Sequence, residues 1–99
     1  YKKGKSFPDK YIVLIYRKNG LSYNRTAFLA SKKVGNSVQR NRAKRLIREG
    51  YRLIESELKQ GNDIVFIARK NINGHKFGEV NRSLLNAVKR TGLLKSKEE

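Results

Sequence analysis

Apolar residues recur along this 99-residue chain with two different periods, and the periods predict where strands and helices lie. Residues 11–16 form a run of β-branched and aromatic side chains that is typical of a strand. Asn19-Gly20 is a turn signal, and residues 25–30 are again β-like, so the two runs are predicted to pair as an antiparallel hairpin with a slightly long loop. A short extended piece that ends at Pro8 is predicted to be an edge strand.

Between residues 36 and 58 the apolar positions take the period of a helix. Asn36 is a favourable N-cap residue, and Gln39 three positions later completes an amide variant of the capping box. The helix is predicted to end before Gly61. On a helical wheel its core face consists of Ala43, Leu46, Ile47, Gly50, Tyr51, Ile54 and Leu58.

The last third of the chain predicts one strand and one helix. Residues 64–68 are continuously apolar, as expected of a central strand covered by helices. Residues 80–90 predict an amphipathic helix stopped by Gly92, and residues 95–99 predict a frayed tail. We therefore expect an α+β fold: one sandwich-like α/β domain over residues 1–99, with the order β-β-β-α-β-α and helices on one face of a four-stranded mixed sheet.

Charge narrows the possible partners. The chain has 24 Lys and Arg against 8 Asp and Glu, a net charge of +16, which favours a polyanionic partner such as nucleic acid. A membrane is not expected, because no apolar stretch approaches the roughly 20 residues of a spanning helix. The absence of cysteine and of a signal-peptide pattern fits a reducing compartment, and the cytoplasm is the expected location.

The predicted long helix places most of its cations on one side. A second arc, roughly 140° from the core face, consists of Arg40, Asn41, Lys44, Arg45, Arg48 and Arg52. Like charges at i and i+4 repel one another, and phosphates that bind them recover this cost by releasing counterions. A merely solvated charged face is the alternative interpretation, and the shortage of acidic residues counts against it. The arc predicts nucleic-acid binding.

Residues 31–49, Ser-Lys-Lys-Val-Gly-Asn-Ser-Val-Gln-Arg-Asn-Arg-Ala-Lys-Arg-Leu-Ile-Arg-Glu, resemble the signature of the bacterial ribonuclease P protein family. The hallmark is Arg-Asn-Arg followed by Lys-Arg, and the likeness extends from Tyr1 to the Leu-rich last helix. The resemblance implies a surface that docks on the catalytic RNA. With Asn36 and Arg52 from the same helix, the predicted RNA-binding set is Lys32, Lys33, Asn36, Arg40, Asn41, Arg42, Lys44, Arg45, Arg48 and Arg52.

The resemblance also implies a cleft between the sheet and this helix for the single-stranded 5′ leader of precursor tRNA. It implies parallel strands at residues 25–30 and 64–68 joined by a left-handed crossover, against the general preference for right-handed connections. Family members usually begin with a basic helix whose Phe forms one wall of the leader cleft. No such helix stands before Tyr1 in these 99 residues, so we expect it to be missing from them.

Three aromatic residues are candidate leader contacts: Tyr11, Tyr16 and Phe28. Bases of single-stranded RNA often stack on aromatic side chains of a sheet, although packing in the core is the commoner role of such residues. Alternation along residues 11–16 sends one set of side chains toward the helices and the other toward the leader. The sequence leaves open which set is which.

No catalytic or metal site is expected in the chain itself. His75 is the only histidine, and the eight acidic residues form no spacing typical of a two-metal site. We therefore expect a subunit of a ribonucleoprotein endonuclease, with catalytic RNA and precursor tRNA as partners, no small-molecule substrate, and Mg²⁺ bound through the RNA. A structural, ribosomal-type RNA-binding protein and a helix-turn-helix DNA-binding protein are the alternatives.

Overall fold

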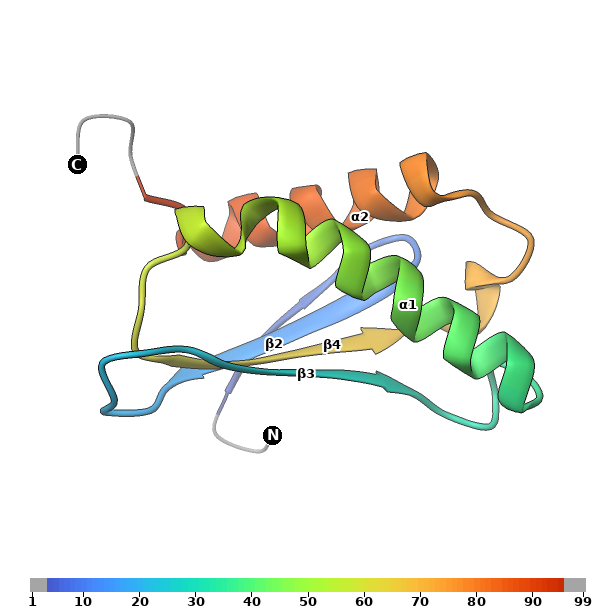
Figure 1. The fold of residues 1–99 in the computed structure, drawn as a ribbon, viewed down its shortest axis with the longest axis horizontal. Helices are drawn as coiled ribbons and strands as arrows, with labels where there is room; N and C mark the ends of the chain where they lie inside the picture. The colour runs from blue at the N-terminus through green and yellow to red at the C-terminus, as the bar shows by residue number, and fades with distance from the viewer. Residues whose placement is uncertain (1–3, 96–99) are drawn as a thin grey trace.

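The computed structural model describes residues 4–95 as one four-stranded sheet with two helices packed on one of its faces (Figure 1). Residues 1–3, where the family likeness begins, and residues 96–99, most of the expected tail, lie outside the described part. The elements are β1 (Lys5–Pro8), β2 (Ile12–Lys18), β3 (Arg25–Ala30), α1 (Ser37–Ile54), η1 (Glu55–Glu57), β4 (Asn62–Ala68), η2 (Lys70–Ile72) and α2 (Phe77–Thr91). The expected order of strands and helices and the expected α+β class are confirmed.

The strands lie in the order β1-β2-β4-β3, so the predicted hairpin between β2 and β3 is wrong. β2 pairs antiparallel with β1 and with β4, whereas β3 pairs parallel with β4. The turn signal at Asn19-Gly20 does reverse the chain, but it does not choose the partner of the strand that follows. β4 has the most buried residues of the four strands and lies between β2 and β3, which separates them.

The parallel strands β3 and β4 are joined through α1. In Figure 1 both strands point to the right, β3 lies nearest the viewer, and α1 returns above the sheet from right to left. This path makes the crossover left-handed, as the family likeness implied. The crossover places the start of α1 beside the ends of β3 and β4, which is where the predicted RNA-binding residues are concentrated.

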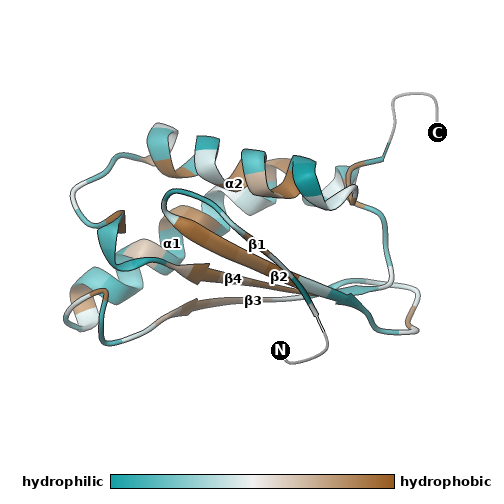
Figure 2. Ribbon diagram, turned by 180° about the vertical axis from the view of Figure 1, so that it is seen from behind, coloured by the Kyte–Doolittle hydropathy of each residue, from teal (hydrophilic) through white to brown (hydrophobic). Residues whose placement is uncertain are grey.

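The two faces of the sheet differ in how they are covered. Along β4 the side chains of Ile64, Phe66 and Ala68 are buried beneath the helices, while the intervening residues are only half-buried. In β2 the buried residues are Ile12 and Leu14. Figure 2 shows the molecule from the side of β1, with the apolar middle of the strands in brown and α2 above them, as in Figure 1. The central strand is therefore covered by helices on one face within residues 4–95.

The seven core-face residues predicted from the wheel are all buried, and six of them belong to α1. α1 itself ends at Ile54, and Leu58 reaches the core from an extended position after η1. Gly50 lets α2 approach closely, because a Cβ there would overlap the side-chain amide of Asn81. α2 begins at Phe77, three residues earlier than predicted, and Gly92 ends it in the left-handed conformation, with φ of 76°.

Candidate nucleic-acid interface

The first turn of α1 is held by side chains that reach back to the backbone. Asn36 Oδ1 accepts the N–H of Gln39 at 2.9 Å, and Gln39 Oε1 accepts the N–H of Asn36 at 2.9 Å, which confirms the predicted capping box. Gly35 has φ of 142°, and a Cβ at this position would overlap Gln39. Asn36, placed in the RNA-binding set, therefore has an identified role as a helix cap. The loop before it presents Lys32 and Lys33 to solvent.

The outward side of α1 carries cations that no acid of the described part of the chain neutralises. Arg45, Arg48 and Arg52 are exposed together with Asn41, while Arg40, Arg42 and Lys44 are half-buried. Among residues 4–95, no carboxylate oxygen lies within 4.0 Å of a cationic nitrogen of α1. The positive charge of this surface is therefore available to a partner. It is called the α1 basic surface below: Arg40, Asn41, Arg42, Lys44, Arg45, Arg48 and Arg52.

A shallow groove of about 520 Å³ runs along the first half of α1. It is lined by Val38, Asn41, Arg42, Lys44, Arg45 and Arg48. Five of these six residues belong to the predicted RNA-binding set. Val38 is the exception; its side chain is apolar and 77% exposed, and charge-based sequence reasoning passed over it.

Two of the arginines make contacts within the protein, and a third is partly buried without a hydrogen bond among the described residues. Arg42 lies on the flank of α1 away from the Arg40 side, and its Nη2 donates to the carbonyl oxygen of His75 at 2.9 Å. The guanidinium of Arg48 lies over the Phe28 ring, 5.4 Å from its centroid. Arg40 Nε is buried and makes no hydrogen bond within residues 4–95. These contacts hold the side chains of Arg42 and Arg48 in place. Arg45 and Arg52 are exposed and are the arginines of this surface that are most accessible to a partner.

The three candidate leader-contacting aromatics lie apart from one another. Tyr11 is 4% exposed and packs against His75, with ring centroids 4.3 Å apart. Tyr16 stacks on Phe7 at 5.8 Å, and its hydroxyl donates to the carbonyl oxygen of Thr91 at 3.3 Å. These two side chains are therefore engaged in packing, and any contact with a leader stays a prediction.

Phe28 belongs to an aromatic cluster beneath α1. Its ring stacks on Phe66 at 5.8 Å and meets Tyr51 edge-on at 5.7 Å. Thr26, on the same side of β3, donates through its hydroxyl to the Tyr51 hydroxyl at 2.8 Å. Buried core side chains such as Ile47 and Phe66 fill the space between α1 and the sheet. Among residues 4–95 that space therefore leaves no room for an RNA strand.

The uncovered face of the sheet is apolar along its middle. Strand alternation and register place six half-buried or exposed apolar residues there, called the open face below: Val13, Ile15, Ala27, Leu29, Val65 and Ile67. The sequence showed this set through its alternation but did not identify it as the uncovered one, because that depends on which side the helices occupy.

One end of the open face is occupied by an ion-pair cluster, called the Asp63 cluster below: Arg17, Arg25 and Asp63. Arg25 holds the Asp63 carboxylate with two bonds of 2.8 Å, Asn19 donates at 3.0 Å, and Arg17 lies 3.9 Å away. The bonds from Arg25 and then from Asn19 lower the pKa of Asp63 to about 2. The same pairing raises the pKa of Arg25. The guanidiniums of Arg17 and Arg25 therefore both pair with the Asp63 carboxylate.

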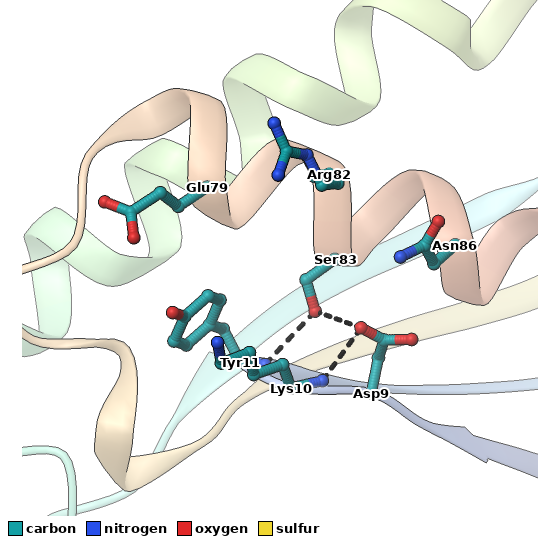
Figure 3. A pocket seen from close by; sticks show the side chains of 7 residues that line it. All are labelled: Asp9, Lys10, Tyr11, Glu79, Arg82, Ser83 and Asn86. Atoms are coloured by element: carbon teal, nitrogen blue, oxygen red, sulfur yellow. Dashed lines mark hydrogen bonds between the residues drawn. The ribbon is translucent and has the colours of Figure 1, made fainter.

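A small polar hollow of about 120 Å³ lies between the β1–β2 turn and α2 (Figure 3). Buried Ser83 connects the two elements, because its hydroxyl accepts the N–H of Tyr11 at 3.1 Å and donates to Asp9 at 2.7 Å. Asp9 also accepts the N–H of Lys10 at 2.8 Å. The polar groups at the base of the hollow thus bond to one another, so the hollow is a structural junction.

The structure identifies no centre for hydrolysis within residues 4–95. His75 Nδ1 lies 2.9 Å from Glu79, and this contact is the first cause that lowers the pKa of Glu79. No group of three or more potential metal-ligating side chains occurs in the described part of the chain.

Two other interpretations concern the helices. None of the helices within residues 4–95 has the length and apolar character that a membrane span requires. The helix-turn-helix interpretation is wrong, because strand β3 and not a helix precedes α1.

Comparison with known proteins supports one family. The family model for Ribonuclease P matches residues 1–92. The ribonuclease P protein component of Clostridioides difficile is 48% identical over 94 residues, which cover 94% of this chain and 82% of that protein. The corresponding protein of Caldanaerobacter subterraneus is 44% identical over 98 residues, with 99% and 84% covered.

Two solved structures share the fold. The ribonuclease P protein of Thermotoga maritima superposes with a TM-score of 0.80 at 38% identity, covering 90% of this chain and 84% of that chain. That of Staphylococcus aureus gives a TM-score of 0.86 at 31% identity, covering 96% and 87%. The chain therefore belongs to the family of ribonuclease P protein components, the protein subunits of the ribonucleoprotein that removes 5′ leaders from precursor tRNA.

Proposed function

We propose that this chain performs its role in ribonuclease P with two separate surfaces. The α1 basic surface, with Lys32 and Lys33, docks on the phosphates of the catalytic RNA. The open face receives the 5′ leader of precursor tRNA. The observation that carries the first assignment is the set of α1 cations that have no acidic partner among residues 4–95, since phosphates that bind them release counterions and offset the repulsion within the helix.

The leader assignment follows from the coverage of the sheet. The space under α1 is filled by core side chains, while the open face presents half-buried or exposed apolar side chains that the described elements leave uncovered. Apolar surface of this kind suits the faces of unstacked bases. The two surfaces lie on opposite sides of the sheet, so the protein can hold both RNAs at once and screen the repulsion between their phosphates.

The chemistry belongs to the RNA. Mg²⁺ bound by the RNA would supply the activated water and stabilise the leaving group, and the protein would favour this by holding the substrate in place. The side chains of this subunit bind and orient and do not transfer protons to the phosphodiester. Its place of action is the cytoplasm, where precursor tRNA is the substrate.

Reconstitution tests the proposal. The full-length protein is added to catalytic RNA and precursor tRNA at low Mg²⁺, and the rate of 5′ cleavage is measured. The proposal predicts faster cleavage than with RNA alone. An unchanged rate would contradict it and would favour a structural RNA-binding role.

Two substitutions, one on each face of the sheet, test which face binds the leader. Val65→Glu places a charge on the open face, while Phe28→Leu alters the aromatic cluster under α1. We expect Val65→Glu to weaken binding of leader-bearing precursor tRNA relative to mature tRNA, because the added carboxylate repels phosphates and removes apolar surface. Phe28→Leu should leave that ratio unchanged. The reverse result would assign the leader to the helix-covered side.

A further inference from the structure

We propose that the groove on α1 receives an unpaired nucleobase of the catalytic RNA, with Val38 packing on the face of the base and Asn41 bonding to its edge. This inference rests on the proposed docking of α1 on that RNA. This contact would recognise an unpaired base, whereas the cations of the same surface bind phosphates.

Val38 is the first observation. It lies in the first turn of α1 and is 77% exposed, among cationic side chains that line the same groove. Single exposed apolar residues are common on protein surfaces and by themselves indicate nothing. Val38 differs because its neighbours leave a hollow beside it, so a planar partner could be buried there on binding.

Asn41 is the second observation. It lies three residues after Val38, hence on the same side of the helix, and lines the same groove. Its amide is exposed and makes no hydrogen bond within residues 4–95. An amide presents one acceptor and two donor hydrogens side by side, the arrangement that pairs with the edge of a base. A phosphate offers acceptors only and would leave the amide oxygen without a partner.

Cations on both sides complete the arrangement. Arg45 and Lys44 lie one turn further along the groove, and Arg42 borders it on the other flank. An RNA strand whose phosphates are held by these side chains would present a base between them. Double-helical RNA hides its base edges in a deep, narrow groove, so a base read in this way belongs to a loop, bulge or strand end.

Salt dependence distinguishes a base contact from a phosphate contact. We would measure the affinity of the full-length protein for the catalytic RNA at several salt concentrations for Val38→Ala and Asn41→Ala. Val38→Ala should weaken binding by up to about tenfold, since two buried carbons are lost. Neither substitution should change the slope of log affinity against log salt, because no phosphate contact is removed.

Leu53→Ala is the matched control. Leu53 is also an exposed apolar residue of α1, 64% exposed, but it lies outside the groove, and its replacement should leave affinity unchanged. Alanine favours the helix more than valine or leucine does, so a loss at Val38 alone cannot come from a weakened helix.

The outcomes separate the inference from the proposed function. If Arg45→Ala flattens the slope but Val38→Ala and Asn41→Ala bind like the parent, the base contact is wrong and the docking surface stands. If Arg45→Ala changes neither affinity nor slope, α1 does not dock on the catalytic RNA and both proposals fail. An equal loss at Leu53 and Val38 would also overturn the base contact, because it would indicate a general apolar interface.

Discussion

The α1 basic surface and the Asp63 cluster are both rich in arginine and both partly exposed, yet they differ in what the arginines face. Arg17 and Arg25 surround one carboxylate, with Arg25 bonded to both of its oxygens at 2.8 Å. The cations of α1 have no carboxylate partner within residues 4–95. Composition alone does not separate these two regions, because each is a local excess of positive charge.

The difference indicates two roles for arginine in one small protein. In the Asp63 cluster one carboxylate of β4 pairs with arginines of β2 and β3 and so connects the three strands at one end of the sheet. On α1 the charges repel one another, and the helix depends on its cap and its buried face for stability. Unpaired charge on a well-anchored helix is the feature that points to an external polyanion.

Removing two exposed arginines of α1 should give the largest effect. Arg45→Ala combined with Arg48→Ala is expected to weaken binding of the catalytic RNA and to flatten its salt dependence by roughly one counterion per lost contact. The measurement is affinity across a salt series. Arg17→Gln serves as the control and should leave the slope in place. If the double variant gave the same slope as the parent, the side chains of Arg45 and Arg48 would not touch phosphates.

Breaking the Asp63 cluster should shift stability in a pH-dependent way. The pKa of Asp63 is about 2 in the folded protein, below its ordinary value of 3.8, so its stabilising effect is present above pH 4 and is lost as the pH falls toward 2. Asp63→Asn should therefore be less stable than the parent at pH 7, and the two stabilities should converge near pH 2. Denaturant unfolding at several pH values measures this.

Asp63→Asn should also change how the Asp63 cluster binds RNA. Asp63→Asn releases Arg17 and Arg25 from their carboxylate and makes the cluster resemble the α1 basic surface. Nonspecific RNA binding should then become tighter at low salt and more salt-dependent. No gain in binding would show that unpaired charge alone does not distinguish the two regions.

The cap of α1 should give the smallest effect. Asn36→Ala removes the bond to the Gln39 N–H and should cost about 1 kcal/mol of unfolding free energy. Asn36→Asp keeps an oxygen acceptor and should restore that stability, while its charge should weaken RNA binding if phosphates lie nearby. Thermal unfolding and RNA affinity of both variants separate a capping role from an RNA contact. A fully stable Asn36→Ala variant would exclude the cap as a support of the helix.

Patterns among residues close together in the sequence predicted much of this fold. The capping box at Asn36, the core face of α1 and the stop at Gly92 depend on neighbours within a few residues, and all three are confirmed. The pairing of β2 with β3 was wrong because strand partners are chosen by burial across the whole chain. β4 entered the sheet between them, which no feature of the turn after β2 could indicate.

The candidate site, like the fold, could be predicted only in part from the sequence. The helical period placed Arg45, Arg48 and Arg52 outward, as the structure has them. The period could not show that Arg42 bonds to the carbonyl of His75, because that loop is distant in sequence. Nor could it identify the open face or the groove beside Val38, since both are defined by which surfaces the rest of the chain leaves uncovered.

Site-directed RNA cleavage tests the central claim most directly. The chain contains no cysteine, so a single Arg45→Cys substitution can carry a tethered hydroxyl-radical probe, with Lys59→Cys as the exposed reference position outside α1. The account predicts localised cuts in the catalytic RNA from position 45 and few or none from position 59. Cuts from position 59 with none from position 45 would place the RNA elsewhere and contradict the assignment of α1 as the docking surface.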